Sequence, residues 1–361
     1  MFSAADHEYM AQALRLAEQG LFGTSPNPRV GCVIVRDGKV AGEGWHERAG
    51  APHAEAHALR AAGSLAQEAT AYVTLEPCSH HGRTPPCADA LIAAGVARVV
   101  VAMRDPNPLV AGQGLARMKA AGIQVESGLL ESAARELNIG FVSRMTRQRP
   151  WVRLKTASSL DGKTALSNGV SFWITGPAAR QDVHRLRARA CAILTGIGTV
   201  LADDPRMDVR EVETTRQPLR IVVDSQLRTP VTAKILTGGK TLIVGSVADK
   251  AKISRLEGAG AEVIILPDAT GQVDLARLLI ELAEREINEV MVEAGCTLNG
   301  ALLNAGLIDE WVMYTAPVLL GDHARGLFDV PELTEMSQRR EVTIRDVTMV
   351  GQDIRIRVLL A

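Results

Sequence analysis

Three short segments, each with a side chain that can bind a metal ion, most constrain how this chain folds. They supply His53, then Cys78 directly after Pro77, and then Cys87 after an eight-residue insert. Imidazole and thiolate are preferred ligands of Zn²⁺, and three protein ligands leave one tetrahedral position open for water. The fold must therefore gather these segments around one ion, and Glu55, two residues after His53, is the expected proton carrier.

The local sequence predicts that two of these segments begin helices. His53 to Ala62 is rich in Ala, Leu and Glu, and Cys87 to Ala94 is a second helical stretch that ends before Gly95. A strand from Thr70 to Leu75 leads to Cys78. Helix N-termini favour thiolate and hydroxide because their backbone N–H groups and positive dipole ends face the site. This placement supports a zinc site independently of the spacing.

Two other interpretations of the metal motif stay open. One is a structural zinc site closed by a fourth protein ligand, and the other is a pair of core cysteines without a metal. The candidates for a fourth ligand are Cys32, His46, His80 and His81. Cys32 lies in an apolar run and is expected to pack in the core, whereas His46 fits a pocket and a solvent-exposed position equally well. Asn27, held between two prolines, is placed to hydrogen-bond the edge of a heterocycle.

The composition favours two globular domains that act on small molecules. A length of 361 residues exceeds the size at which single cores usually stop growing. A net charge of -1 and an aromatic content of 3% argue against a nucleic-acid surface, which needs basic patches and stacking platforms. We therefore expect a small-molecule substrate and no nucleic-acid partner.

The sequence also predicts a cytoplasmic protein without a membrane partner. No apolar run approaches the roughly 18 residues that a membrane span needs, and the first residues lack the features of a secretion signal. The five cysteines, an odd number scattered over the chain, suit reduced thiols and a metal better than a disulfide framework.

Strand and helix patterns alternate along both halves of the chain, which indicates layered α/β domains. The alternation breaks in a basic, proline-ended stretch, residues 144–150, before a new strand from Trp151 to Thr156. The predicted domains are residues 1–146 and 147–361. In the second, residues 292–300 form a strand-to-helix turn that is suited to holding a phosphate, although a plain connection would look the same.

The motifs together resemble those of the bifunctional pyrimidine deaminase-reductases of riboflavin biosynthesis. The segments that carry this resemblance are residues 25–31, 53–55, 77–87, 105–108, 154–162, 173–175, 199–205 and 292–295. The long spacing between Cys78 and Cys87 is characteristic of that family. The resemblance implies an N-terminal cytidine-deaminase-like three-layer domain followed by a dihydrofolate-reductase-like α/β domain.

The resemblance also implies two consecutive reactions. The first is zinc-dependent deamination of a 2,5-diamino-6-(5-phosphoribosylamino)pyrimidin-4-one at ring carbon 2, with Glu55 moving the protons. The second is reduction of the ribosyl group to a ribityl chain by hydride from NADPH. The family further suggests a homo-oligomer that assembles through the reductase domain.

The expected site residues of the reductase follow from the resemblance by position. Those expected to contact NADPH are Ala157, Trp173, Thr199, Asp203, Ser225, Gly295, Cys296, Thr297, Leu298, Asn299, Gly300 and Ala301. Those expected to contact substrate are Asn27 in the first domain and Ser171, Arg187, Arg210 and Glu293 in the second. Arg187 and Arg210 are suited to a bidentate grip on the 5-phosphate, although a solvated helix face is the alternative for Arg187. Lys155 and Asp203 are candidates for orienting the sugar imine or handling its proton.

Two competing functions stay open on the sequence alone. One is a nucleic-acid or free-base zinc deaminase with an appended nucleotide-binding domain. The other is a structural zinc protein whose second domain senses a nucleotide, which four protein ligands on the metal would favour.

Overall fold

A computed structural model of the protein describes residues 1–79, 86–108, 110–171 and 173–360. His80 and His81, two of the candidate fourth ligands, lie outside these residues. The chain forms two compact units, Met1–Gln148 and Arg149–Ala361, each with its own hydrophobic core. Within the part of the chain that is described, no helix has the length and hydropathy to span a membrane.

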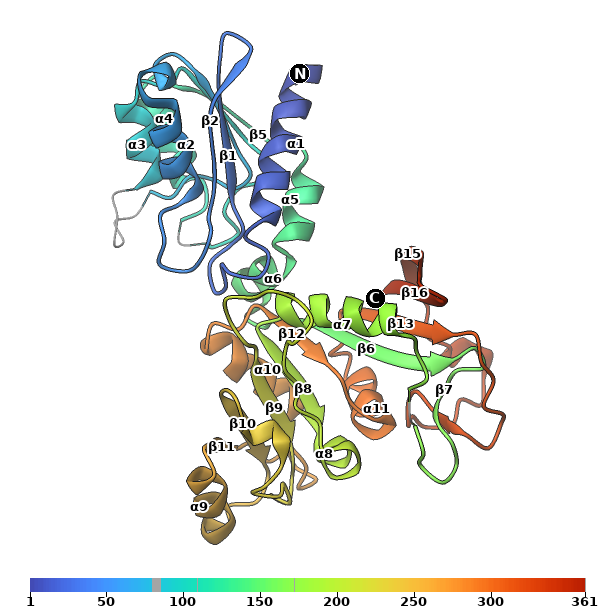
Figure 1. Ribbon diagram of the computed structural model, residues 1–361. Helices are drawn as coiled ribbons and strands as arrows, with labels where there is room; N and C mark the ends of the chain where they lie inside the picture. The colour runs from blue at the N-terminus through green and yellow to red at the C-terminus, as the bar shows by residue number, and fades with distance from the viewer. Residues whose placement is uncertain (80–85, 109, 172, 361) are drawn as a thin grey trace. The chain divides into compact units, whose positions relative to one another are not determined.

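The first unit is a three-layer α/β/α domain, as expected. Its sheet has the order β2-β1-β3-β4-β5, in which β1 is antiparallel to both neighbours and β3, β4 and β5 are parallel. The strands are β1 (Gly31–Arg36), β2 (Lys39–Trp45), β3 (Thr70–Val73), β4 (Arg98–Val101) and β5 (Gln124–Ser127). The helices are α1 (Ala4–Glu18), α2 (Ala54–Ala62), the short η1 (Gly63–Ala66), α3 (Cys87–Ala93), α4 (Gln113–Ala120) and α5 (Glu131–Leu137). Figure 1 shows α2, α3 and α4 on one face of the sheet and α1 and α5 on the other.

Two glycines of β2 let α2 approach the sheet backbone to backbone. A Cβ at Gly42 would lie 2.2 Å from the carbonyl oxygen of Ala58, and one at Gly44 would lie 2.5 Å from that of Ala54. Neither position has room for a side chain. This close packing sets the position of the first turn of α2, which carries His53 and Glu55.

Replacing Gly44 with Ala is expected to lower the free energy of unfolding of the first unit by about 1–3 kcal/mol, because the new methyl group overlaps the backbone of α2. Urea denaturation followed by circular dichroism measures this change. Gly258, at the end of a helix of the second unit, has nothing within 4 Å of an added Cβ. The control Gly258→Ala should therefore leave stability unchanged or slightly raised, and an equal loss in both variants would contradict the packing argument.

The first part of the basic stretch at the end of the first unit is helical. α6 (Ile139–Arg147) buries Phe141 and Ser143, and Gln148 ends it in a left-handed conformation with φ 55. Arg147 lies on the exposed side of the helix, so its charge stays in water and is compatible with the helix. The predicted boundary between residues 146 and 147 falls inside α6, and the compact units divide after Gln148.

The second unit is built on a nine-stranded sheet with the order β11-β10-β9-β8-β12-β6-β13-β16-β15. The strands from β11 to β13 are parallel, and β16 and β15 add an antiparallel hairpin at one edge. The central strands are β6 (Trp151–Ser159), β8 (Ala192–Gly196), β12 (Glu289–Val292) and β13 (Glu310–Ala316). The outer strands are β9 (Leu219–Val223), β10 (Thr241–Gly245), β11 (Ala261–Ile265), β15 (Val342–Val350) and β16 (Asp353–Leu360). β7 (Lys163–Ala165) and β14 (Arg325–Gly326) pair separately.

Alternating side chains of this sheet divide between two helical layers. α10 (Leu275–Glu284) and α11 (Cys296–Asn304) pack on the face that carries Leu154, Leu194 and Val292. The opposite face packs against α7 (Pro177–Arg189), α8 (Ile197–Asp203) and α9 (Lys250–Gly258). The chain builds outward from β6 to β11 and then returns to insert β12 between β8 and β6. Ligands of open α/β sheets bind at such reversals, beyond the carboxyl ends of the strands.

A buried ion network joins the opposite, amino ends of three of these strands. Arg153 on β6 donates to Glu289 on β12 and to Glu310 on β13 at 3.0 and 2.9 Å. All three side chains are almost fully buried. Burial acts to raise the pKa of Glu310, but the charges of Arg153 and Arg357 outweigh it and lower the pKa to about 2.

The free energy of unfolding of the second unit is therefore expected to fall as the pH drops from about 4.5 to about 2. The folded-state pKa of Glu310, about 2, lies below its ordinary value of 4.5, so its stabilisation is complete above 4.5 and disappears towards 2. The loss from this group is on the order of 3 kcal/mol. Urea unfolding across this pH range measures the slope, and Glu310→Gln should flatten it. An equal slope in both proteins would contradict the assignment.

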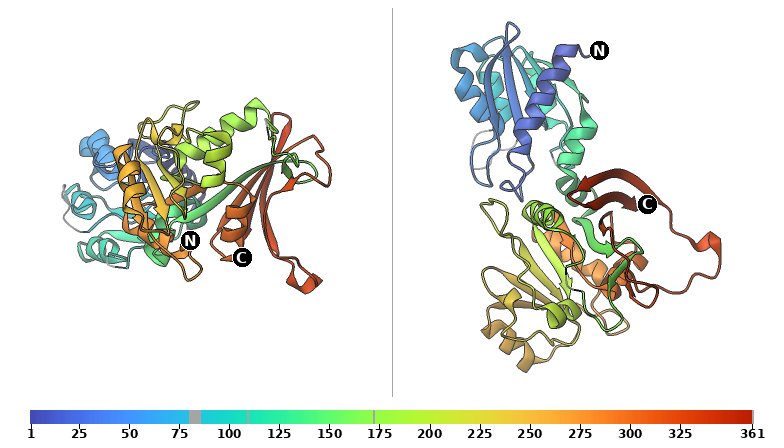
Figure 2. Two further views of the ribbon diagram at one scale, coloured as in Figure 1. Left: turned by 90° about the horizontal axis from the view of Figure 1, so that it is seen from below. Right: turned by 45° about the vertical axis from the view of Figure 1, so that its right-hand side comes forward.

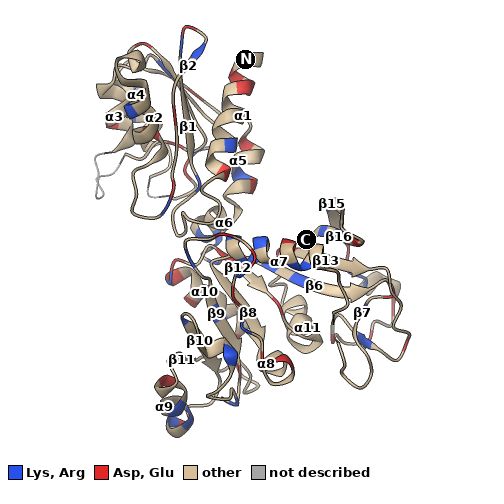
Figure 3. Ribbon diagram, in the orientation of Figure 1, with Lys and Arg blue, Asp and Glu red and all other residues tan. Residues whose placement is uncertain are grey.

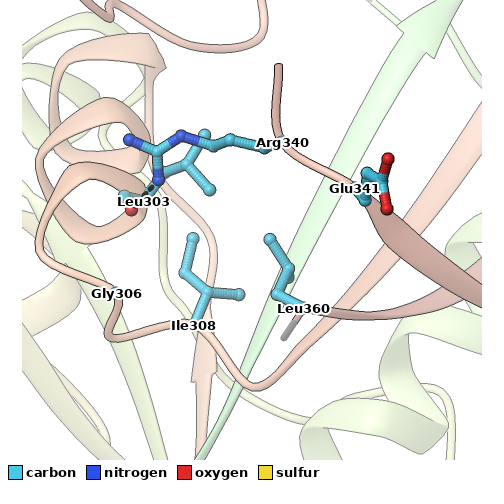
Figure 4. Close-up of a pocket in the computed structure, with 6 residues that line it drawn as sticks. All are labelled: Leu303, Gly306, Ile308, Arg340, Glu341 and Leu360. Atoms are coloured by element: carbon cyan, nitrogen blue, oxygen red, sulfur yellow. Dashed lines mark hydrogen bonds between the residues drawn. The ribbon is translucent and has the colours of Figure 1, made fainter. Parts of the chain in front are cut away.

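Mixed charges, an exposed apolar strand and an apolar pocket lie in different parts of the second unit. Figure 3 shows basic and acidic residues interspersed on α9, as they are on α5 of the first unit. The β15–β16 hairpin projects from the sheet edge (Figure 2) and exposes a row of apolar side chains on β15. An apolar pocket lies at the amino end of β13, lined by Leu303, Ile308 and Leu360 with Arg340 across its mouth (Figure 4). This pocket is at the end of the strands away from the expected ligand site.

Candidate zinc and dinucleotide sites

The structure brings the three predicted metal ligands of the first unit together. His53 is the N-cap of α2, Cys87 is the first residue of α3, and Cys78 lies in the segment after β3. His53 Nδ1 is 3.3 Å from Cys87 Sγ and 3.7 Å from Cys78 Sγ. Zinc bonds of about 2.1 Å to nitrogen and 2.3 Å to sulfur give a tetrahedral N–S edge of about 3.6 Å. The donor atoms therefore fit a zinc ion without rearrangement.

The first turn of α3 stabilises a thiolate at this site. The backbone N–H of Cys87 donates to Cys78 Sγ at 3.3 Å, and that of Ala88 donates to the carbonyl oxygen of Cys78 at 3.2 Å. A hydrogen bond from the Cys87 side chain and the neighbouring His53 imidazole lower the pKa of Cys78 to about 4, although burial acts the other way. Cys78 is thus ready to bind a cation at neutral pH.

Glu55 lies beside the ligands but is not one of them. Its side chain, 3% exposed, follows His53 in the first turn of α2. Burial raises the pKa of the Glu55 carboxyl above its ordinary range. A carboxyl with a raised pKa both accepts and delivers protons more readily near neutral pH.

His46 contacts the ligand His53 and is hydrogen-bonded to Asn27. His46 Nδ1 lies 3.0 Å from the carbonyl oxygen of Pro52, which can only accept, so this nitrogen carries the proton. His46 Nε2 then accepts from Asn27 Nδ2 at 3.1 Å. The ring of His46 meets that of His53 edge to face, with centroids 5.4 Å apart. His46 is 2% exposed, so the solvent-exposed alternative is wrong. Because the Asn27 Nδ2 group donates to His46, the other end of the amide, Oδ1, offers an acceptor.

The remaining candidate ligand, Cys32, is a core residue. It is fully buried in β1 among apolar side chains. Within the described ranges, the one group of donors that could hold a metal ion consists of His53, Cys78 and Cys87. A three-ligand set leaves a coordination position for water or substrate.

In the second unit, three of the expected site residues meet where β12 ends, beside the middle of β6. Arg187 on α7 donates from Nε and Nη2 to Glu293 at 2.6 and 2.9 Å, and Lys155 Nζ lies 3.9 Å from the same carboxylate. Burial acts to raise the pKa of Glu293, but Arg187 and Lys155 outweigh it and lower the pKa to about 2. Burial lowers the pKa of Lys155.

This pairing shows the partners of Arg187 in the ligand-free structure. Its bidentate edge faces Glu293, and Nη1 donates to the carbonyl oxygen of Asp208 at 3.0 Å. The Arg187 side chain is 13% exposed, so the solvated helix face is wrong, and the contact of Arg187 with substrate stays a prediction. Arg210 is more accessible, since its side chain is 47% exposed, and pairs with the Asp208 carboxylate. Its backbone N–H donates to His184 Nδ1 at 3.3 Å.

The expected dinucleotide residues surround the same ends of the sheet. Glu293 N–H donates to the carbonyl oxygen of Leu194, so the turns that follow β8 and β12 are neighbours. Thr199 and Asp203 lie on α8, Ala157 lies on β6, and Ser225 follows β9. Buried oxygens without a partner among the described atoms include Thr195 Oγ1 at the end of β8 and Asn299 Oδ1 in α11. Orphaned polar atoms beside two helix N-termini fit a phosphate-bearing cofactor.

The remaining expected cofactor residues differ in accessibility. Gly295, Thr297 and Ala301 are exposed, whereas Cys296 and Leu298 are half-buried. Gly300 is buried, and a Cβ there would lie 1.9 Å from the carbonyl oxygen of Asp329. Gly300 therefore allows close packing of the α11 backbone against Asp329.

The loop before α7 carries two further expected residues. Ser171 is exposed, and Trp173 is 63% exposed with φ 44. The guanidinium of Arg180 lies 4.4 Å from the Trp173 ring centroid, which holds the ring by a cation–π contact.

Sequence reasoning missed two members of this cluster. Asp208 binds Arg206 and Arg210 and accepts from Arg187 through its carbonyl oxygen, and His184 is 5% exposed beside Arg210. The alternation of Arg206, Asp208 and Arg210 was the available signal, because such spacing places opposite charges on one side of an extended chain.

The two units match two different families. Residues 3–103 match the cytidine and deoxycytidylate deaminase zinc-binding region, and residues 150–356 match the RibD C-terminal domain. The fold and the two matches define a bifunctional enzyme class, a zinc-binding deaminase joined to a reductase.

Relatives of nearly the same length identify the family. The chain is 51% identical to riboflavin biosynthesis protein RibD of Escherichia coli strain K12, over 98% of this chain and 99% of that protein. It is 46% identical to RibD of Haemophilus influenzae, over 98% and 97%. The solved structure of Acinetobacter baumannii RibD has a TM-score of 0.92 at 48% identity, covering 99% of each chain. The chain belongs to the RibD family of riboflavin biosynthesis proteins.

A more distant structure carries a fuller description. The protein from Thermotoga maritima, a diaminohydroxyphosphoribosylaminopyrimidine deaminase/5-amino-6-(5-phosphoribosylamino)uracil reductase, matches with a TM-score of 0.88 at 32% identity. It covers 99% of both chains. Both units of the present chain are thus found joined in one enzyme with two named activities.

Proposed function

We propose that this chain deaminates a diaminohydroxyphosphoribosylaminopyrimidine in its first unit and reduces the ribosyl group of the deaminated product with NADPH in its second. The observation that carries the proposal is the preformed set of His53, Cys78 and Cys87 with a buried Glu55 beside it. The full-length match to an enzyme named for both activities supports the choice of substrate.

In the first unit, His53, Cys78 and Cys87 would hold zinc, which when bound lowers the pKa of a water molecule towards neutrality. Glu55 accepts a proton from water and delivers it to a ring nitrogen of the pyrimidine. The water oxygen adds to ring carbon 2, and Glu55 then carries the proton of the new hydroxyl group to the amino group. The C–N bond breaks to leave a ring carbonyl and ammonia. Asn27 Oδ1 accepts a hydrogen bond from an N–H group at the heterocycle edge, and His46 holds the amide in that orientation.

In the second unit, NADPH supplies a hydride for the sugar carbon bonded to nitrogen. Lys155, buried with a lowered pKa, is a candidate proton donor to that nitrogen, and Glu293 holds the ammonium group in place. Ser171, Arg187 and Arg210 would contact substrate, the two arginines at its 5-phosphate, and Arg187 also orients Glu293. The residues proposed to surround the cofactor are those expected from sequence, with Thr199 in the first turn of α8 and Cys296 and Thr297 in the first turn of α11.

A two-stage assay of the purified full chain tests the proposal. Ammonia release from the diamino substrate should come first, and NADPH oxidation should follow only after deamination. Bound zinc should amount to one ion per chain. Deamination of cytosine in oligonucleotides, with no activity on the phosphoribosyl substrate, would instead establish the nucleic-acid alternative.

We also infer a homo-oligomer that forms through the second unit, and a cytoplasmic location. The assembly is supported by the apolar row on the edge strand β15, where Ile344, Val347 and Met349 are 64%, 59% and 62% exposed. An exposed apolar edge strand is suited to pairing with another chain.

Replacing Ile344 with Lys is expected to shift the protein from oligomer to monomer, because a charge would be buried in the contact. Analytical ultracentrifugation measures the distribution. Leu65, an exposed apolar residue of the first unit at 56%, provides the matched control Leu65→Lys, which should keep the oligomer. An unchanged mass for Ile344→Lys would show that β15 is not part of the interface.

A further inference from the structure

We propose that α4 braces the zinc site through two contacts, which hold the two cysteine-bearing segments at a fixed separation. One is made by Glu76, which follows β3 and binds the first turn of α4, and the other by Arg117 of α4 itself. The inference rests on the proposed zinc site and adds positioning residues to it. Neither side chain belongs to the group of metal donors found among the described residues.

Glu76 is a buried carboxylate that accepts four backbone hydrogen bonds. It follows β3 and is 5% exposed. Its Oε2 accepts from the N–H groups of Asp105 and Gly112 at 3.1 and 2.9 Å. Its Oε1 accepts from those of Gly114 and Leu115 at 3.0 and 3.3 Å. Since Gly112, the N-cap residue of α4, supplies no side-chain cap, Glu76 satisfies the first turn of that helix from another part of the chain.

These bonds fix the path of the backbone into Cys78. Glu76 stands two residues before Cys78, and its own N–H donates to the carbonyl oxygen of Met103 at 3.0 Å. Gly114 of α4 touches Pro77 so closely that a Cβ there would lie 2.1 Å from the Pro77 carbonyl oxygen. The segment that delivers the first thiolate is therefore pressed against the first turn of α4.

Arg117, one turn further along α4, connects this segment to the second cysteine. Its Nε lies 2.6 Å from Asp89 Oδ1, and Asp89 follows Cys87 by two residues in α3. Its Nη1 donates to the carbonyl oxygen of Ser79, the residue after Cys78, at 3.4 Å. One guanidinium thus bridges the two segments that carry the thiolates.

A brace of this kind acts on metal affinity, because a ligand set held at the correct separation need not be ordered when the ion binds. Loss of groups that orient metal ligands typically costs about 10- to 100-fold in affinity. Glu76 makes four buried hydrogen bonds, whereas Arg117 is half-exposed. The larger effect is therefore expected at Glu76.

The test measures zinc affinity of the full-length protein by competition with a chelating dye. Glu76→Gln should bind zinc about 10- to 100-fold more weakly, since an amide nitrogen would face backbone donors. Arg117→Gln should weaken zinc binding by a few-fold. It should also change the visible absorption spectrum of the cobalt-substituted protein, because the ligands are held less firmly. NADPH oxidation with the deaminated substrate should be unchanged in both variants.

Asp6 offers a matched control. It is a buried carboxylate of the same unit, 5% exposed, and accepts hydrogen bonds from Tyr72 and Arg98. Asp6→Asn should lower the free energy of unfolding yet leave zinc affinity within about twofold, because Asp6 touches neither cysteine segment.

The outcomes separate the brace from the zinc site itself. A wild-type chain that binds no zinc would contradict the proposed function. Zinc-binding wild type with unchanged affinity in Glu76→Gln would overturn the brace alone, and so would equal losses in Glu76→Gln and Asp6→Asn. If Glu76→Gln does not fold, Arg117→Gln decides: weaker binding supports the brace and unchanged binding overturns it.

Discussion

Replacing Glu55 with Gln is expected to abolish ammonia release, by about 10²- to 10⁴-fold, while NADPH oxidation continues when the deaminated pyrimidine is supplied. The amide keeps the size of the side chain in the first turn of α2 but cannot take up or deliver a proton. Zinc content should be unchanged, because His53, Cys78 and Cys87 supply the ligands and Glu55 does not. Parallel assays of ammonia and NADPH on the same preparation measure both halves of the result.

The matched control for this variant is a carboxylate-to-amide change elsewhere in the first unit. Glu68 is an exposed residue just before the amino end of β3, whereas Cys78 follows the carboxyl end, so Glu68→Gln should keep both activities. Normal deamination by Glu55→Gln would show that Glu55 does not carry the protons in this reaction. Loss of zinc together with activity would show that Glu55 holds the site rather than moving protons.

Replacing Glu293 with Gln is expected to give the mirror image: NADPH oxidation falls by about 10²-fold or more, and ammonia release is retained. The carboxylate accepts both hydrogen bonds from the bidentate edge of Arg187 and faces Lys155. Breaking a buried pair by removing one partner typically costs about 3–5 kcal/mol, because the other charge stays buried. Arg187 and Lys155 would then repel each other at the place where the sugar nitrogen is expected.

Glu310 provides the control for the general cost of losing a buried carboxylate. It is 2% exposed and pairs with Arg153 at the opposite end of the sheet. Glu310→Gln should lower stability but keep NADPH turnover at temperatures where the unit is folded. Equal losses of turnover in the two variants would mean that Glu293 acts through the fold and not through the site.

The zinc site could be predicted because its signal is local. His53 and Cys87 stand at the starts of helices that their own neighbours encode, and Cys78 follows an apolar strand. Once these elements form, a layered α/β domain brings their ends together at one sheet edge. The strand predicted from Thr70 to Leu75 is confirmed as β3, Thr70–Val73, for the same reason, since an apolar run reports burial directly.

The pairings of the second unit depend on topology that no local pattern reports. Arg187 and Glu293 meet because β12 inserts beside β8, far from its sequence neighbours. From sequence alone, Arg187 was expected to contact the 5-phosphate or to lie on a solvated helix face. The carboxylate that occupies the fork, and Asp208 behind it, come from segments whose proximity is decided by the order of strands.

The strand order also sets when each half can fold during synthesis. Every strand of the first unit's sheet lies within residues 31–127, so that unit can close while the ribosome is still making the second. The central strand β6, by contrast, must wait for β12 and β13, whose pairing residues lie more than a hundred positions later. Long-range parallel pairing is slow, and unpaired strands invite aggregation. Expression of this enzyme is therefore expected to depend on how long β6 stays unprotected as the nascent chain lengthens.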